Sequence, residues 1–320
     1  MIRWPAKRDD MPFPIVLAHG LCRFDVLWNT APRVDNTDDA ALDELHYFRG
    51  VRTMLRRRGH RVYHSRVAFA ASVEARAEQL ATNLQRVLDE ARAPQVNVIA
   101  HGTGGLDARH MLFNDRTRGR LHERVASLTT ISTPHEGSPF ADWGLDRFPE
   151  LPAVLRAVLV NVEGLQDLTT AMCRAFNKRP EVQAFEDACQ TTIRFQTYAG
   201  RQPRPAVIPL LQPAFEIVEA AEGENDGLVS VRSARWRDGY FKGFLETPTT
   251  STSWFTGTPT SSCGVRRPAP CAPGCTPSTP RSRPTCRSPP GPAQTIRSKW
   301  YSRVWLTSSG STRSPVWRKP

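Results

Sequence analysis

The segment VNVIAHGTGGLDARH, residues 96–110, has the spacing of a nucleophile site but carries a glycine at its centre. Its β-branched residues over 96–99 predict a buried strand, and helix-compatible residues follow at once. Small residues at Ala100 and Gly104 would let the backbone turn sharply between them and expose the side chain at position 102. A serine there could form an acyl intermediate, whereas Gly102 has no oxygen with which to do so. Taken alone, the segment also fits an ordinary glycine-rich turn.

Three further segments carry residue types that suit acyl transfer. The apolar strand in PIVLAHGL ends in His19 and Gly20, a natural place for a backbone N–H to face a developing negative charge. The segment ENDGLVSV places Asp226 in a turn after the last expected strands. The segment TTISTPHEGSPFADWGL, which begins at Thr129, lies between these two in the chain.

In this order, the four segments resemble the bacterial triacylglycerol lipase and esterase family of α/β-hydrolases, whose elbow usually reads His-Ser-x-Gly-Gly. The resemblance covers roughly residues 14–246. It implies that the backbone N–H groups of Leu21 and Thr103 form the oxyanion hole. It also implies that Asp226 is the acid of a catalytic triad and that Gly102 stands where the nucleophilic serine has been lost.

The family further implies a catalytic histidine that follows the acid in the chain. The eight histidines lie at positions 19, 46, 60, 64, 101, 110, 122 and 135. None of them follows Asp226. We interpret His19 and His101, which adjoin the motif glycines, as structural residues that shape the site together with Gly20 and Gly104.

Residues 247–320 differ sharply in composition from the rest of the chain. The chain carries a net charge of +12, and this segment contains eleven lysines and arginines and no acid, which leaves the first 246 residues near neutral. The segment also holds thirteen of the 27 prolines and four of the seven cysteines. No helical or strand period runs through most of it. We expect a disordered tail after a single hydrolase domain over residues 1–246.

Three interpretations of the tail compete. It could be a basic arm that binds nucleic acid or acidic lipid, a cysteine metal site, or a product of translation out of frame. The cysteine spacings match no zinc pattern, which argues against a metal site. Natural basic arms are rich in lysine and glycine, whereas this tail is rich in arginine and proline, which argues against a basic arm. When residues 247–257 are decoded one base earlier, the genetic code permits the peptide Asp-Ala-Asp-His-Phe-His, which would restore a histidine near Thr250. We favour a frameshift between Phe241 and Pro248.

Hydrophobic periodicity over the first 246 residues predicts the α/β fold of an α/β-hydrolase, with a mostly parallel, doubly wound sheet. The expected helices span 47–58 and 72–92, and the expected strands after the first span 61–67, 96–99, 125–131 and 192–198. A long insertion over 143–190 contains an apolar run. By resemblance to lipases we interpret it as a helical lid over an acyl pocket, with two ordinary helices that close the core as the alternative.

The ligand and the location follow from the same resemblance and from what the sequence lacks. We expect a lipid or ester small molecule as the ligand, no cofactor or metal, no specific nucleic acid, at most transient contact with a lipid surface, and a monomer. No apolar signal segment precedes the first strand, so we expect a cytoplasmic protein. The resemblance implies a carboxylic-ester hydrolase, and the missing serine and histidine lead us to expect that it has lost most or all activity. The alternative is a non-catalytic protein that binds acyl ligands.

Overall fold

The computed structural model describes residues 13–20, 33–35, 47–48, 50–68, 71–147, 162–207 and 209–245. Three parts of the sequence predictions lie outside the described residues: Leu21, the expected tail over 247–320, and residues 148–161 of the expected lid. The predictions made for these three segments therefore stay predictions.

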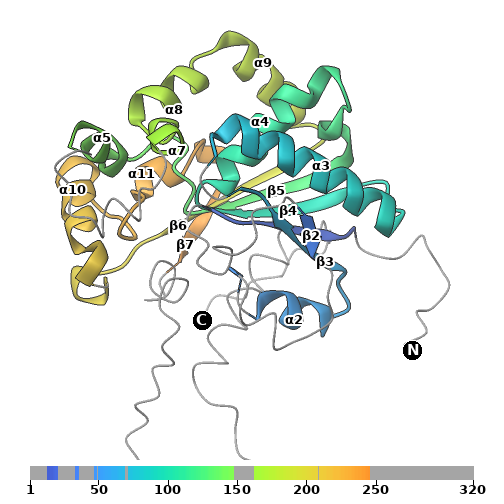
Figure 1. The fold of residues 1–320 in the computed structure, drawn as a ribbon, viewed down its shortest axis with the longest axis horizontal. Helices are drawn as coiled ribbons and strands as arrows, with labels where there is room; N and C mark the ends of the chain where they lie inside the picture. The colour runs from blue at the N-terminus through green and yellow to red at the C-terminus, as the bar shows by residue number, and fades with distance from the viewer. Residues whose placement is uncertain are drawn as a thin grey trace, which may run out of the picture.

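The described strands form one seven-stranded sheet in the order β2-β3-β1-β4-β5-β6-β7 (Figure 1). The neighbours from β3 to β7 are parallel, and β2 pairs antiparallel with β3 at the edge. This confirms the predicted mostly parallel sheet. The strands are β1 (Ile15–Ala18), β2 (Arg33–Asp35), β3 (Val62–Arg66), β4 (Val96–His101), β5 (Val125–Ile131), β6 (Arg194–Gly200) and β7 (Phe241–Leu245).

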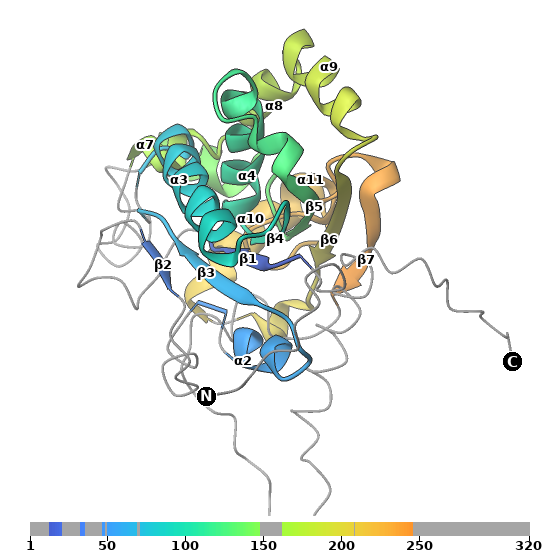
Figure 2. The ribbon, with the colours of Figure 1, turned by 90° about the vertical axis from the view of Figure 1, so that its right-hand side faces the viewer.

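Helices cover both faces of this sheet (Figure 2), as expected for a doubly wound fold. The helices α3 and α4 lie against one face, and α2 lies against the other. The α-helices are α2 (Val51–Arg56), α3 (Val73–Ala91), α4 (Gly104–Asn114), α5 (Pro139–Asp146), α7 (Val162–Gln166), α8 (Thr170–Asn177), α9 (Pro180–Cys189), α10 (Gln212–Glu222) and α11 (Val231–Ala234).

The strand β1 shows how the sequence fills both layers of the core. Val16 and Ala18 pack in the cluster that contains α3 and α4. Ile15 and Leu17 belong to the cluster that contains α2. Because successive side chains of a strand point to opposite faces, a strand with helices on both sides must be apolar at every position. The unbroken run of apolar residues in β1 is therefore a consequence of its central place.

The helix α3 follows its sequence prediction closely, whereas α2 is shorter than predicted. The side chain of Ser72 accepts a hydrogen bond from the backbone of Ala75 and caps α3, which ends at Ala91, before Arg92 with φ +46°. The predicted helix over 47–58 instead begins after Gly50, whose φ of +67° lies outside the helical region. A residue in that conformation interrupts the helical hydrogen-bond pattern, so Tyr47 lies in a turn before α2.

The order of the strands brings two expected motif turns together. In the sheet, the chain runs from β1 to β2 and β3 on one side and then crosses over to β4 on the other side, so the strand order reverses between β1 and β4. Ligands of open parallel sheets bind at the carboxyl ends of strands at such a switch point. Gly20 follows β1 and Gly102 follows β4, so both turns lie at this edge.

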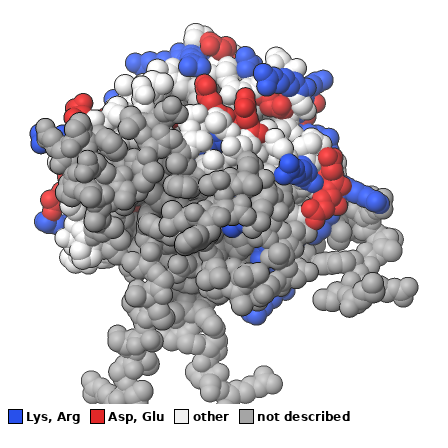
Figure 3. Space-filling model, in the orientation of Figure 1, with Lys and Arg blue, Asp and Glu red and all other residues white. Residues whose placement is uncertain are grey.

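The described surface carries charges of both signs. In Figure 3, arginines and lysines alternate with acids along the upper and right-hand margins of the face shown. This mixture agrees with the near-neutral composition of the first 246 residues. Among the helices that are described, none is long and apolar enough to cross a bilayer.

Candidate active site

Gly102 occupies a sharp turn between β4 and α4. Its φ of +56° lies in the left-handed region, which glycine adopts without the cost that a Cβ imposes. The backbone N–H of Gly102 donates to the carbonyl oxygen of Ile131 over 2.9 Å, and its own carbonyl accepts from the N–H of Gly105 over 3.2 Å. These bonds hold residue 102 at the carboxyl edge of the sheet, in the strand–turn–helix arrangement that presents a nucleophile.

Gly104 allows α4 to begin directly against the end of β1. A Cβ at this position would lie 2.6 Å from the carbonyl oxygen of Ala18 and 2.7 Å from that of His19. Both distances are shorter than real Cβ contacts, so any side chain here would push α4 away from the sheet. The helix N-terminus, with its positive dipole end, therefore lies next to the turn that follows β1.

Position 102 itself has room for a side chain. Within 4 Å, a Cβ added to Gly102 would meet only the Cα of Gly20 among the described atoms, at an ordinary contact distance of 3.7 Å. Crowding therefore does not explain the missing serine. Among the described residues, what opposes a Cβ here is the left-handed backbone.

The Thr103 side chain points away from the position of a nucleophile. Its hydroxyl oxygen accepts a hydrogen bond from Arg76 over 3.2 Å, inside a buried network in which Arg76 pairs with Asp107 at 2.6 Å. Thr103 therefore cannot replace the serine. Its backbone nitrogen lies 3.3 Å from the place where a Cβ on Gly20 would stand. The two turns to which the resemblance assigns the oxyanion donors are thus adjacent, although Leu21 itself is not described.

Arg76 is a structural residue that the sequence did not reveal. Besides Asp107, it donates to the carbonyl oxygen of His19 over 3.2 Å and to that of Ala68 over 3.0 Å. Burial raises the pKa of the Asp107 carboxyl, and the neighbouring Arg76 guanidinium partly offsets this rise. The network ties the end of β1 to α3 and α4, so it holds the two motif turns in register.

His19 is fixed by the backbone on both of its ring nitrogens. Its Nε2 accepts from the N–H of Val67 over 3.2 Å, and its Nδ1 lies 2.7 Å from the carbonyl oxygen of Gly20. This pattern requires the proton on Nδ1, which leaves no lone pair for a substrate proton. The arrangement agrees with the structural role expected for His19.

His101 also has a structural partner. Its Nδ1 lies 2.6 Å from the hydroxyl oxygen of Tyr47. Burial lowers the pKa of His101 to about 4, so the ring is neutral at pH 7. Sequence reasoning missed Tyr47, because nothing in the local pattern marks it as the partner of a residue 54 positions later.

Asp226 lies in a tight turn and is 4% exposed. Its Oδ1 accepts backbone N–H groups from Leu228 over 3.1 Å and from Val229 over 2.9 Å, and the carboxyl group also bonds the Ser132 side chain. Burial raises the pKa of Asp226, and these hydrogen bonds oppose the rise. A Cβ on Gly200, the last residue of β6, would lie 3.1 Å from Oδ2, so the carboxyl group lies at the same sheet edge as the elbow.

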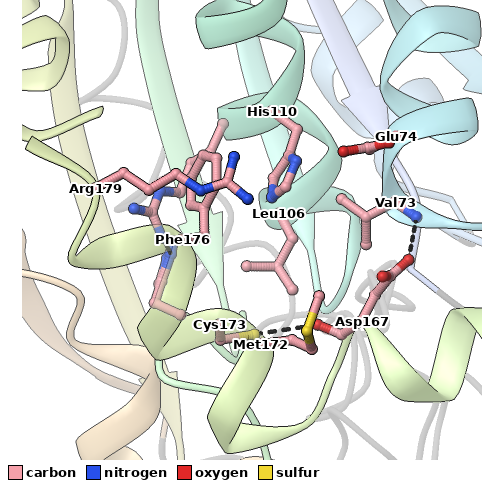
Figure 4. Close-up of a pocket in the computed structure, with 11 residues that line it drawn as sticks. Val73, Glu74, Leu106, His110, Asp167, Met172, Cys173, Phe176 and Arg179 are labelled. Atoms are coloured by element: carbon pink, nitrogen blue, oxygen red, sulfur yellow. Dashed lines mark hydrogen bonds between the residues drawn. The ribbon is translucent and has the colours of Figure 1, made fainter. Parts of the chain in front are cut away.

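His110 and Cys173 line a separate small cavity between α3, α4 and α8 (Figure 4). The cavity volume is about 50 Å³, room for a few water molecules. The His110 ring stacks on Phe176 at a centroid distance of 3.9 Å, and burial lowers its pKa to about 3. Burial also raises the pKa of the Cys173 thiol to about 12. Neither residue replaces the base or the nucleophile.

The described part of the expected lid is anchored to the body of the fold. Arg109 on α4 pairs with Glu186 on α9 at 2.8 Å, with both side chains largely buried. The same guanidinium donates to the side-chain oxygen of Asn177 at the end of α8 over 2.8 Å. Phe113, Phe176 and Val182 form an apolar cluster at this contact. The helices α8 and α9 therefore pack as fixed parts of the fold, and a lid over 143–190 stays a prediction.

The parallel sheet with its switch point, the left-handed turn at Gly102 and the buried Asp226 at the same edge are the features of the α/β-hydrolase fold. Solved structures agree with this fold. The chain superposes on the mature Bacillus licheniformis lipase BlEst2 with a TM-score of 0.55 and 18% identity, over 76% of this chain and 88% of that one.

In sequence, the chain is a relative of the triacylglycerol lipases. It is 29% identical to triacylglycerol lipase 2 of Saccharomyces cerevisiae over 267 residues, which cover 73% of this chain and 77% of that one. It is 26% identical to a triacylglycerol lipase of Pseudarthrobacter phenanthrenivorans over 279 residues, which cover 68% and 81%. No protein-family model matches the chain. The predicted resemblance is thereby confirmed at the level of fold and homology.

Proposed function

We propose that this chain is a carboxylic-ester hydrolase of the lipase type by descent that binds a lipid or ester but has lost most or all of its hydrolytic activity. The observation that carries the proposal is Gly102 at the centre of an intact elbow turn. Acyl transfer by this fold needs an oxygen at that position to attack the ester carbonyl. A glycine supplies none, so no acyl-enzyme can form there.

The rest of the expected machinery supports a hydrolase ancestry. The Thr103 N–H lies at the start of α4, where a backbone donor can stabilise the negative oxygen of a tetrahedral intermediate. Asp226 is held by backbone amides, as suits an acid that orients the imidazole of a catalytic base. With a serine as nucleophile and a histidine as base restored, the Thr103 N–H as oxyanion donor and Asp226 as acid would complete the catalytic site.

A second loss concerns the base. No histidine follows Asp226 in the sequence, and in this fold the catalytic histidine comes after the acid. We propose that the residues after about 247 are encoded out of frame and that the original frame carries Asp-His near position 250. Sequencing the gene across codons 235–260 tests this. Stop codons in the frame one base earlier would contradict the proposal.

A non-catalytic acyl-binding protein is the second candidate. The observation that favours it is the preserved turn: a Cβ on Gly102 would meet only the Cα of Gly20 among the described atoms, and the backbone hydrogen bonds of the turn remain. A ligand carbonyl could then rest in the site without being attacked. Binding of a non-hydrolysable alkyl ether analogue, measured by calorimetry, separates this candidate from a chain that binds nothing.

A serine-directed fluorophosphonate probe tests the lost nucleophile on the protein as it stands. We expect no covalent label by intact-mass spectrometry, because the probe needs an activated hydroxyl. A triacylglycerol lipase with an intact serine is the positive control. Stoichiometric labelling of any serine or threonine, mapped by peptide mass spectrometry, would place the nucleophile elsewhere and contradict the proposal.

A further inference from the structure

Ser132, the first residue after β5, has a backbone conformation that serine rarely adopts. Its φ is +46°, in the left-handed region, and the residue is 1% exposed. Glycine takes this conformation readily, while other residues keep it only when the surrounding structure enforces it. A buried serine at such a position indicates that its hydroxyl group is used.

The contacts of Ser132 show what the hydroxyl does. The backbone N–H of Ser132 donates to the carbonyl oxygen of Tyr198 over 2.9 Å, which anchors the residue to β6. Its Oγ accepts the N–H of Gly200 over 3.1 Å. Accepting that bond leaves the hydroxyl proton free to be donated. The Asp226 carboxyl lies on the same side of Gly200 as this hydroxyl, and a hydrogen bond from Ser132 lowers its pKa.

The three residues can meet because Gly200 lacks a side chain. A Cβ there would lie 2.7 Å from Ser132 Oγ and 3.1 Å from Asp226 Oδ2. The preceding residue, Ile131, accepts the N–H of Gly102. Two consecutive residues at the end of β5 therefore hold the elbow and the acid.

We propose that Ser132 is a positioning residue that orients the Asp226 carboxylate through a hydrogen bond while it is itself fixed by the backbone of Gly200. The catalytic meaning of this role rests on the proposed function, in which Asp226 is the triad acid. The contact itself is independent of whether the chain hydrolyses esters.

The test measures the pKa of Asp226 in the full chain. Aspartate labelled with ¹³C at its carboxyl carbon reports the titration by NMR, and Asp226→Asn identifies the signal. A hydrogen bond to a carboxylate lowers its pKa, so Ser132→Ala should raise the pKa of Asp226 by about one unit. Ser132→Gly should give the same rise. Since glycine adopts φ +46° readily, that variant keeps the test valid if Ser132→Ala fails to fold.

Ser138→Ala is the matched control. Ser138 is also buried, and its hydroxyl proton is donated to the carbonyl oxygen of Leu228 in the Asp226 turn over 2.7 Å. It should leave the pKa of Asp226 unchanged. An unchanged pKa in both Ser132 variants, or an equal rise in Ser138→Ala, would overturn the proposal. Neither outcome depends on ester hydrolysis, so failure of the proposed function is recognised separately by the absence of turnover in a repaired enzyme.

Discussion

The backbone N–H of Gly102 donates to the carbonyl oxygen of Ile131 over 2.9 Å, so the turn after β4 is locked to the end of β5. This bond belongs to the backbone and does not depend on which side chain stands at position 102. Loss of the serine therefore leaves the turn in place. The backbone turn of a hydrolase site can therefore persist after the nucleophile is lost.

Restoring the serine alone should make the protein less stable. At φ +56°, a side chain costs on the order of 1–3 kcal/mol relative to glycine. Gly102→Ser and Gly102→Ala should therefore both lower the free energy of unfolding, measured by urea denaturation, by about this amount. The alanine variant is the control, because it carries the backbone cost without the hydroxyl. A Gly102→Ser protein as stable as the parent would show that the turn is not strained.

The buried ion pair between Arg109 and Glu186 should be essential to the packing of α8 and α9. Arg237 also pairs with Glu186, at 3.1 Å, so Arg109→Ala leaves this carboxylate with one of its two arginines and removes the hydrogen bond to Asn177. The change should lower the free energy of unfolding by about 3 kcal/mol, the lower end of the range for a broken buried ion pair. Arg204→Ala is the matched control, because Arg204 pairs with Glu216 at the surface, where such pairs contribute about 1 kcal/mol or less. Equal losses in the two variants would contradict the anchoring of these helices.

Asp226 should reduce stability at neutral pH. Burial raises its pKa above the ordinary value of 3.8, so the folded state binds a proton at pH values where the unfolded state has released it. Stability contributed by this group is present below pH 3.8 and is lost as pH rises through the higher folded pKa. Asp226→Asn keeps an acceptor for the Leu228 and Val229 amides, so it should be more stable than the parent at pH 7.

As a control, the free energies of unfolding of the parent and of Asp226→Asn are measured again at pH 3. There the carboxyl group is protonated in both states, and the advantage of asparagine in urea denaturation should vanish. An advantage that persists unchanged at pH 3, or a less stable variant at pH 7, would show that the buried charge is not what destabilises the parent.

The sequence predicted best the features that depend on local pattern. The apolar period and the Ser72 cap placed α3 almost to the residue, and the apolar runs of β4 and β5 placed the centre of the sheet. Gly102 was found because the spacing of small residues around it is itself a local signal. The helix at 47–58 was overestimated, because Gly50 could be a tolerated helical glycine until its backbone was seen.

The residues that hold the site together could not be predicted, because their partners are distant in the chain. Arg76 and Asp107 are 31 positions apart, and Arg109 and Glu186 are 77 apart. Nothing near either arginine marks it as buried, since most arginines are exposed. The role of Ser132 could not be predicted either, because nothing in the sequence indicates that this serine has a left-handed backbone.

The central claim, that the chain is a hydrolase missing its nucleophile and its base, is tested most directly by assaying four proteins on a p-nitrophenyl ester: the chain as it stands, Gly102→Ser, the chain with its tail decoded one base earlier, and both changes together. Members of a triad act as a unit, and single losses cost nearly as much as loss of all of them. We therefore predict turnover above background only for the doubly repaired protein. Comparable turnover by the unaltered chain, or none by the double repair when it is folded, would contradict the account.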